Sequence, residues 1–191
     1  MPITVNTSQP RPPKKDPVLH ANNKWLTWLI EAAIIALAVL VVIIVRVKIY
    51  NVSIVISRSM EPTLHIGDRL VFDHRSSIQG QWKRGDIVFF EPPPTWQDAE
   101  GDLLVKRLIA LPNETIFIRA GHVYVDNQEI TEGMVEDGND NLGPRKLGPD
   151  EYFVLGDNRG NSDDSRNQGP IRKQDIRGRA VYRLWPSPGA L

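Results

Sequence analysis

One unbroken apolar stretch stands out near the start of the chain. Residues 26–45 contain a single charged side chain, that of Glu31. An α-helix of this length rises about 30 Å, which matches the hydrocarbon thickness of a bilayer. Trp25 and Trp28 lie at its start, where aromatic side chains favour the membrane interface. The pattern therefore predicts one transmembrane helix over residues 25–47.

A cleavable secretory signal has a similar apolar run, but the residues that follow argue against it. Residues 46–50 read Arg-Val-Lys-Ile-Tyr and offer no small-x-small cleavage site, so we predict an uncleaved anchor. Basic residues are slightly more numerous before the stretch than after it, which favours a cytoplasmic N-terminus. They are Arg11, Lys14, Lys15 and Lys24 before it, and Arg46, Lys48 and Arg58 after it. We predict a disordered cytoplasmic tail at 1–24 and an extracytoplasmic domain at 48–191.

Beyond the anchor, apolar residues fall in short runs separated by Gly, Pro, Asn and Asp, which is typical of a mainly β domain. The pairs Ala120-Gly121 and Asp126-Asn127 lie between alternating segments and predict hairpin turns. Residues 92–96 are expected to form an exposed loop from which Trp96 could reach a membrane interface. The predicted strands are 52–56, 69–72, 86–90, 103–109, 115–118, 122–125, 152–155 and 179–184.

Composition excludes some kinds of function. The 191 residues include 23 Lys and Arg against 23 Asp and Glu, so no strongly basic domain is present to neutralise nucleic-acid phosphates. We therefore expect no nucleic-acid partner. The absence of cysteine removes thiol nucleophiles, disulfides and thiolate metal sites together. No cofactor and no metal are predicted.

Residues 57–64, Ser-Arg-Ser-Met-Glu-Pro-Thr-Leu, follow the first predicted strand. Ser57 and Ser59 are two residues apart, so their side chains point to the same side of an extended chain. One hydroxyl can attack a substrate while the other donates a hydrogen bond to the oxyanion. Taken alone, such a segment is more often a polar strand end.

A basic pair, Lys106-Arg107, interrupts the apolar strand 103–109. A lysine in this place is commonly a sheet-edge residue that discourages aggregation. If it is buried, however, its pKa falls and a neutral amine becomes available as a general base. A Ser-His-Asp triad stays open as an alternative, although no histidine lies in a nucleophile elbow, and a Ser-Lys pair is favoured. The histidines after the anchor are His65, His74 and His122.

Residues 156–166 read Gly-Asp-Asn-Arg-Gly-Asn-Ser-Asp-Asp-Ser-Arg and follow a clear strand. Side chains of these types hydrogen-bond locally and form loops. A Ca²⁺-binding loop is the alternative, but the carboxylates lack the spacing and the terminal Glu of an EF-hand. The acidic run at 136–141 has no ligand spacing either and is expected to be an exposed turn.

Taken in order behind an N-terminal anchor, four segments of the chain resemble bacterial signal peptidase I, the membrane-bound Ser-Lys endopeptidase. They are the Ser-x-Ser-Met-x-Pro-Thr-Leu segment at 57–64, Gly-Asp-Ile-Val at 85–88, the Lys-Arg pair at 106–107 and the loop at 156–166. The resemblance implies a mainly β protease fold and makes the domain at 48–191 catalytic. Some members of the family insert a large second domain between the lysine and this loop. Only 49 residues lie between Lys106 and Gly156, so the resemblance implies a short β extension there.

The resemblance also implies roles for individual residues. Ser59 would be the nucleophile and Lys106 the general base. The oxyanion hole would consist of Ser57 and the Ser59 backbone amide, and Ser162 would orient the lysine amine. Two ion pairs would support the site, Asp157 with Arg107 and Asp164 with Arg166.

Two positions depart from the family's usual residues. Ile56 stands where the family usually has Pro, and Asn113-Glu114 stands where Gly-Asp is common. Asn tolerates the positive φ that Gly would supply, so we expect the turn at 113 to survive.

The implied activity is removal of N-terminal signal peptides from exported precursors after small-x-small sites such as Ala-x-Ala. The precursor would bind as an added β-strand along residues 51–59 and 103–106, next to membrane lipid. The implied location is the plasma membrane, with the thylakoid membrane left open. Two alternatives remain: an inactive, anchored peptide-binding scaffold, and a Ser-Lys protease that trims a single pilus or conjugation protein.

Overall fold

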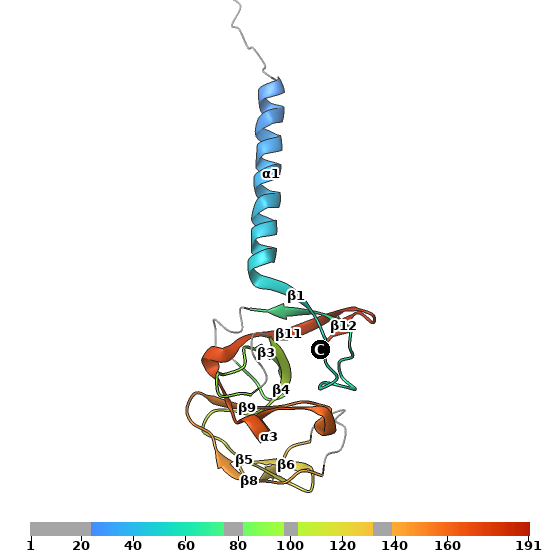
Figure 1. Ribbon diagram of the computed structural model, residues 1–191. Helices are drawn as coiled ribbons and strands as arrows, with labels where there is room; N and C mark the ends of the chain where they lie inside the picture. The colour runs from blue at the N-terminus through green and yellow to red at the C-terminus, as the bar shows by residue number, and fades with distance from the viewer. Residues whose placement is uncertain (1–23, 75–81, 98–102, 132–138) are drawn as a thin grey trace, which may run out of the picture. The chain divides into compact units, whose positions relative to one another are not determined.

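The computed structural model describes residues 24–74, 82–97, 103–131 and 139–191, without the side chains of residues 44–51 (Figure 1). The chain divides into an N-terminal unit that ends at Val42 and a second unit that begins at Ile43. Residues 1–23, nearly all of the predicted disordered tail, lie outside the described ranges.

A single long helix, α1 (Lys24–Ile49), contains the predicted transmembrane segment and extends slightly beyond it at both ends. The apolar side chains of its first five turns are exposed in the isolated chain, including those of Trp25 and Trp28. A helix that is apolar all round is stable only in apolar surroundings. By its length and composition, α1 is able to cross a membrane.

The second unit is built on an antiparallel sheet in the strand order β1-β2-β11-β3-β4-β9-β10, with β12 paired to β11. The long strand β11 lies between β2 and β3 and so joins the N-terminal strands to the centre of the sheet (Figure 1). The strands are β1 (Tyr50–Ile54), β2 (Arg69–Asp73), β3 (Ile87–Phe90), β4 (Leu104–Ala110), β9 (Glu151–Leu155), β10 (Ile171–Arg172), β11 (Ile176–Trp185) and β12 (Gly189–Ala190).

Strand β3 is buried on both faces of this sheet, since its alternate side chains enter two different apolar clusters. Ile87 and Phe89 belong to one cluster, and Val88 and Phe90 belong to the other. This double burial explains an unbroken apolar run where a half-exposed strand would alternate. The cluster of Phe89 also receives side chains from 57–64, so the sheet provides the platform for that segment.

A smaller antiparallel sheet, in the order β7-β6-β5-β8, forms the predicted β extension. At the two predicted hairpin turns, Ala120, Gly121, Asp126 and Asn127 have φ values of 48°, 83°, 48° and 67°. Two-residue hairpins need these left-handed values, so both turn predictions are confirmed. Asn113 likewise adopts φ 68°. The strands of this sheet are β5 (Thr115–Arg119), β6 (His122–Val125), β7 (Gln128–Glu129) and β8 (Leu142–Lys146).

All eight strands predicted from apolar runs are present, with ends displaced by a few residues. Strands β7, β8, β10 and β12 were not predicted, because β8 is mostly exposed and the other three have two residues each, too few to show alternation. The short helix α3 (Ser165–Gln168), whose first residue is buried, was also missed.

The expectation for Trp96 is wrong. Its side chain is only 5% exposed and packs edge-to-face on Phe90, with ring centroids 5.3 Å apart. A backbone hydrogen bond from Trp96 N to Pro93 O (2.9 Å) turns the proline-rich segment back toward the sheet. Burial of so large an aromatic surface in the core outweighs the tendency of Pro-rich segments to remain exposed.

Candidate active site

Apolar side chains hold the segment 57–64 on the domain. Met60 and Leu64 are fully buried in the cluster formed by β2 and β3 side chains, and Leu64 N donates a hydrogen bond to Met60 O at 2.8 Å. Directly before these anchors, Ser59 is 7% exposed. The position of its hydroxyl is therefore set by the packing of the residues that follow it.

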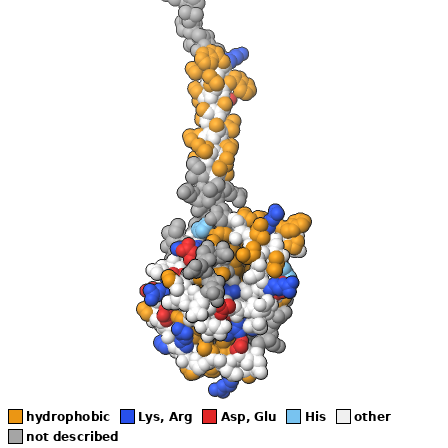
Figure 2. All heavy atoms as spheres, in the orientation of Figure 1, with side chains coloured by type: hydrophobic (Ala, Val, Ile, Leu, Met, Phe, Trp, Pro, Cys, Tyr) orange, Lys and Arg blue, Asp and Glu red, His pale blue; other side chains and the backbone are white. Residues whose placement is uncertain are grey.

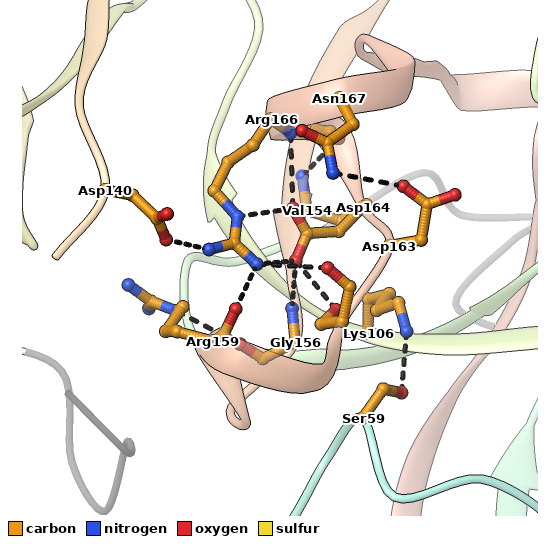
Figure 3. Close-up of polar contacts among 12 residues, drawn as sticks. Ser59, Lys106, Asp140, Val154, Gly156, Arg159, Asp163, Asp164, Arg166 and Asn167 are labelled. Atoms are coloured by element: carbon orange, nitrogen blue, oxygen red, sulfur yellow. Dashed lines mark hydrogen bonds and ion pairs between the residues drawn. The ribbon is translucent and has the colours of Figure 1, made fainter. Parts of the chain in front are cut away.

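Strand β4 carries Lys106 to this hydroxyl. Lys106 Nζ lies 2.6 Å from Ser59 Oγ, and the lysine is 5% exposed (Figure 3). The strand is fixed at this point by pairing with β3, where Val88 lies opposite Lys106. An amine within hydrogen-bonding distance of a hydroxyl meets the first geometric requirement for a general base.

Burial lowers the pKa of Lys106 from its ordinary 10.5 to about 8, because removal from water disfavours the charged amine. The positive charge of Arg166 lowers this pKa further, whereas the carboxylates of Asp164 and Asp163 oppose the shift. A useful fraction of the amine is therefore neutral at mildly alkaline pH. Only this neutral form can accept the proton of Ser59.

Ser57 Oγ lies 3.2 Å from Ser59 Oγ, so the two hydroxyls share one side of the chain as their spacing predicted. Ser57 is exposed, in contrast to the buried Ser59. A peptide carbonyl that approaches Ser59 from solvent can therefore also meet the hydroxyl of Ser57.

The loop 156–166 covers the backbone of the nucleophile. Asn158 N donates to Ser59 O at 3.0 Å. A Cβ atom at Gly156 would lie 2.4 Å from Ser59 O and 2.2 Å from Ser162 Oγ, closer than any side chain tolerates. Glycine at 156 is thus required by the close approach of these two segments.

Within this loop, Ser162 Oγ donates to Asp164 Oδ2 at 2.7 Å, and Gly156 N donates to the same oxygen at 3.0 Å. Arg166 completes the group, since its Nε and Nη2 lie 2.8 and 2.9 Å from the two oxygens of the buried Asp164 (Figure 3). The structure thus brings Asp164 and Arg166 together beside Ser162. No hydrogen bond joins Ser162 to Lys106 among the described residues, and the orienting role of Ser162 stays a prediction.

Arg107 and Asp157 also meet. Arg107 Nε and Nη2 lie 2.7 and 2.6 Å from the two carboxylate oxygens of Asp157, which is 1% exposed. Such a two-pronged ion pair fixes both partners in orientation as well as in distance. It joins the residue next to Lys106 to the residue next to Gly156, and so connects β4 to the loop.

Two of the three histidines that follow the anchor have side-chain partners on other elements. His74 Nδ1 is 2.7 Å from Arg177 O, and His122 pairs with Glu129 at 2.8 Å on the smaller sheet. His65 is exposed. Among the described side chains, the hydroxyl of Ser59 hydrogen-bonds to Lys106 and Ser57, so the geometry favours the Ser-Lys pair over a Ser-His-Asp triad.

Two contacts at the site had no counterpart in the sequence predictions. Thr63 Oγ1 donates to Asp157 Oδ2 at 2.5 Å. Asp140 pairs with Arg166, although it belongs to the run 136–141 that was expected to be an exposed turn, of which residues 136–138 lie outside the described ranges. The polar pattern around these residues gives no signal, since both contacts join segments far apart in sequence.

Known proteins resemble this chain along most of its length. The sequence profile described as "Signal peptidase, peptidase S26" matches residues 25–185. A signal peptidase I of Leptolyngbya laminosa is 36% identical over 156 residues, which are 80% of this chain and 77% of that protein. A signal peptidase I P of Bacillus subtilis subsp. natto is 30% identical over 184 residues, or 90% and 95% of the two chains. A crystal structure of a signal peptidase I from Enterococcus faecalis is 28% identical and covers 52% of this chain and 96% of its own, with a TM-score of 0.41.

Proposed function

The chain belongs to the signal peptidase family, peptidase S26, and is a membrane-anchored serine endopeptidase of the signal peptidase I type, for which we propose Ser59 and Lys106 as the catalytic dyad. The observation that carries this proposal is the 2.6 Å contact between the lysine amine and the serine hydroxyl, both nearly buried. A structural lysine has no need of a desolvated position against a hydroxyl, because water or a carboxylate would satisfy its charge better.

We propose the following reaction. The neutral amine of Lys106 takes the proton of Ser59 as Oγ attacks the scissile carbonyl carbon. Ser57 and the Ser59 backbone N–H stabilise the negative charge that develops on the carbonyl oxygen. The lysine ammonium then protonates the leaving amine, so that the C–N bond breaks and an acyl-enzyme remains. Water, deprotonated by the same amine, hydrolyses this ester, and Ser59 regains its proton.

The loop residues would support this dyad. The hydroxyl of Ser162 donates a hydrogen bond to Asp164. Its oxygen therefore keeps lone pairs that can accept a hydrogen bond from the Lys106 amine. Asp164 and Arg166 would hold Ser162 in that orientation, and Arg107 with Asp157 would hold β4 against the loop. These residues would keep Ser59 and Lys106 in place, and the dyad alone would carry out the bond-breaking steps.

A strand edge beside the dyad, which no described strand covers, supports binding of the substrate as an added β-strand. Strand β4 pairs with β9 from Arg107 onward, but at Leu104, Val105 and Lys106 its partner among the described strands is β3 alone. The backbone groups on the other edge of 104–106 are thus available to an extended peptide, which main-chain hydrogen bonds can hold while side-chain pockets select small residues. We propose that signal peptides of exported precursors bind there and are cut after Ala-x-Ala-like sites.

For the arrangement at the membrane, we propose a cytoplasmic N-terminal tail at 1–24, a spanning segment at 25–47 and an extracytoplasmic catalytic domain at 48–191. The plasma membrane is the expected location, and a thylakoid membrane is the alternative. Several large apolar side chains of the domain are exposed, which supports contact with lipid. Figure 2 shows hydrophobic side chains gathered at one end of the domain. The exposed large apolar side chains on strands β1 and β11 are those of Val52, Ile54, Tyr182, Leu184 and Trp185.

The dyad is tested by cleavage of a purified precursor with an Ala-x-Ala site in detergent. Ser59→Ala and Lys106→Ala should each abolish cleavage while expression and thermal unfolding remain close to wild type. Ser187→Ala and Lys83→Ala change the same residue types at exposed positions and should cleave normally. Cleavage at the wild-type rate by either dyad variant would refute the proposed mechanism.

The two alternative functions are separated by the range of peptides cut. An inactive scaffold would bind precursors without cleaving any of them. A protease dedicated to one pilus or conjugation protein would cleave that protein and leave unrelated Ala-x-Ala precursors intact. Cleavage of several unrelated precursors is the result that we expect.

A further inference from the structure

Thr63 lies at a junction between the segment that carries the nucleophile and the strand that carries the base. Its hydroxyl donates to Asp157 Oδ2 at 2.5 Å. Arg107 Nη2 lies 2.6 Å from the same carboxylate oxygen and 3.4 Å from Thr63 Oγ1. The three side chains thus form one closed polar cluster around a carboxylate that is 1% exposed.

This cluster joins Ser59 and Lys106 by a route separate from their own contact. Arg107 directly follows Lys106 in β4, so its two-pronged contact with Asp157 anchors the strand beside the residue that carries the amine. Thr63 is four residues beyond Ser59, and the hydrogen bond from Leu64 N to Met60 O (2.8 Å) makes the intervening chain a single compact turn. A displacement of Thr63 therefore displaces the serine.

Two consecutive loop residues, Asp157 and Asn158, hydrogen-bond to the segment 57–64 that carries Ser59. The Asp157 carboxylate holds the Thr63 hydroxyl, and Asn158 N holds Ser59 O at 3.0 Å. A third hydrogen bond comes from β11, where Arg183 Nη2 donates to Thr63 O at 2.5 Å. Of these bonds, the one from Thr63 Oγ1 is the only one made by a side chain of the segment itself.

We propose that Thr63 is a positioning residue of the peptidase, whose hydroxyl, through Asp157 and Arg107, sets the distance and angle between the Ser59 hydroxyl and the Lys106 amine. This inference rests on the proposed dyad and extends it to a residue with no contact to the reacting atoms. Proton transfer depends steeply on this geometry, so a small shift of Ser59 should lower the rate of the chemical step.

The proposal distinguishes position from charge. Thr63 is neutral, and the charges that act on the pKa of Lys106 are those of Asp164, Asp163 and Arg166. Removing the hydroxyl should therefore leave the pH at which activity appears unchanged. Substrate binding along the edge of β4 should change little, because Leu104 and Val105 remain held by their pairing with β3.

The test compares Thr63→Val, which keeps the shape and removes the hydroxyl, with Thr63→Ser, which keeps the hydroxyl. For Thr63→Val we expect kcat to fall on the order of 10- to 100-fold, with KM within about twofold and the alkaline rise of kcat/KM at the wild-type pH. Thr63→Ser should restore most of kcat. Thr115→Val makes the same chemical change on the smaller sheet, where the Thr115 side chain makes no hydrogen bond within the described residues, and should have wild-type kinetics.

Two measurements keep a folding defect apart from a positioning defect. Thermal unfolding of all four proteins is recorded, and kinetics are compared well below the lowest midpoint. Ser59→Ala is assayed in parallel, since retained activity in that variant would refute the proposed dyad itself and not the role of Thr63. Wild-type kcat in Thr63→Val, or an equal loss in Thr63→Val and Thr63→Ser, would overturn the proposal.

Discussion

At the scale of single residues, Lys106 combines two opposed demands. Its long aliphatic stem suits the apolar strand β4, whereas its amine loses hydration there and gains the hydroxyl of Ser59 in return. The neighbouring carboxylates, Asp164 and Asp163, keep the pKa from falling further than about 8. Lys106 can therefore be either a neutral amine or a charged ammonium near pH 8, and the proposed reaction uses both forms in turn.

We expect kcat/KM to rise with pH through the pKa of Lys106 near 8 and to stay high on the alkaline side until the fold itself titrates. The sign follows because only the neutral amine can accept the proton of Ser59. A histidine base with an ordinary pKa would reach its plateau more than a unit lower. The measurement is a pH profile of the wild type beside His65→Ala, His74→Ala and His122→Ala. Loss of activity in one histidine variant together with a plateau below pH 7 would contradict the lysine assignment.

The same pKa predicts a cost in stability. In the unfolded chain Lys106 binds a proton up to its ordinary pKa of 10.5, but in the folded protein only up to about 8. The folded state is therefore penalised below pH 8, by at most about 3 kcal/mol, and the penalty disappears as pH rises from 8 to 10.5. Lys106→Met should raise the free energy of unfolding at pH 7, and the gain should shrink toward pH 10. Urea titrations at several pH values measure this, and a gain that grows with pH would contradict it.

At the scale of elements, the two sheets share an apolar cluster, in which Ile109 and Phe153 pack with Ile116 and Val125, and an ion pair links the smaller sheet to the loop 156–166. Asp140, shortly before β8, pairs with Arg166 in α3, and its backbone carbonyl accepts from Gly121 N (3.0 Å) in the β5–β6 hairpin. Arg166 Nη2 in turn donates to Ser162 O at 3.2 Å. The smaller sheet therefore helps to place the loop that carries Ser162, although it contributes no residue to the proposed dyad.

Replacing Asp140 by Asn should remove one of the two carboxylates that neutralise Arg166. Because the Asp140 side chain is 45% exposed, we expect a loss of only about 1 kcal/mol in the free energy of unfolding. The kcat should fall a few-fold as the loop 156–166 loosens, with KM unchanged. Asn139→Ala, at the adjacent exposed position, is the control. Identical kcat in the two variants would show that the smaller sheet has no influence on catalysis.

At the scale of the whole molecule, the proposed orientation can be tested by labelling, since the chain contains no cysteine. A single cysteine at Asn127, in an exposed hairpin turn, should react with a membrane-impermeant maleimide added to spheroplasts. A cysteine at Ser8 in the tail should react only after the membrane is opened. The reverse pattern would invert the topology and with it the access to exported precursors.

The sequence alone was enough to predict features that depend on neighbouring residues. The unbroken apolar run predicted α1, the short apolar runs predicted eight strands, and the pairs at 120–121 and 126–127 predicted both hairpin turns. These features follow from helix length, strand periodicity and backbone sterics, all of which act over a few residues. The spacing of Ser57 and Ser59 belongs with them, because alternation in an extended chain places both hydroxyls on one side.

Only the tertiary structure decided which distant residues meet. Lys106 reaches Ser59 across 47 positions and Thr63 reaches Asp157 across 94, so no local pattern distinguishes them from a surface lysine and a strand-end threonine. Trp96 was misplaced for the same reason, since its burial depends on a core that other strands supply. The pKa of Lys106 likewise comes from burial among segments far apart in the chain. Side-chain type limits the chemistry that is possible, and long-range packing selects the residues that perform it, because distance and desolvation are properties of the assembled fold.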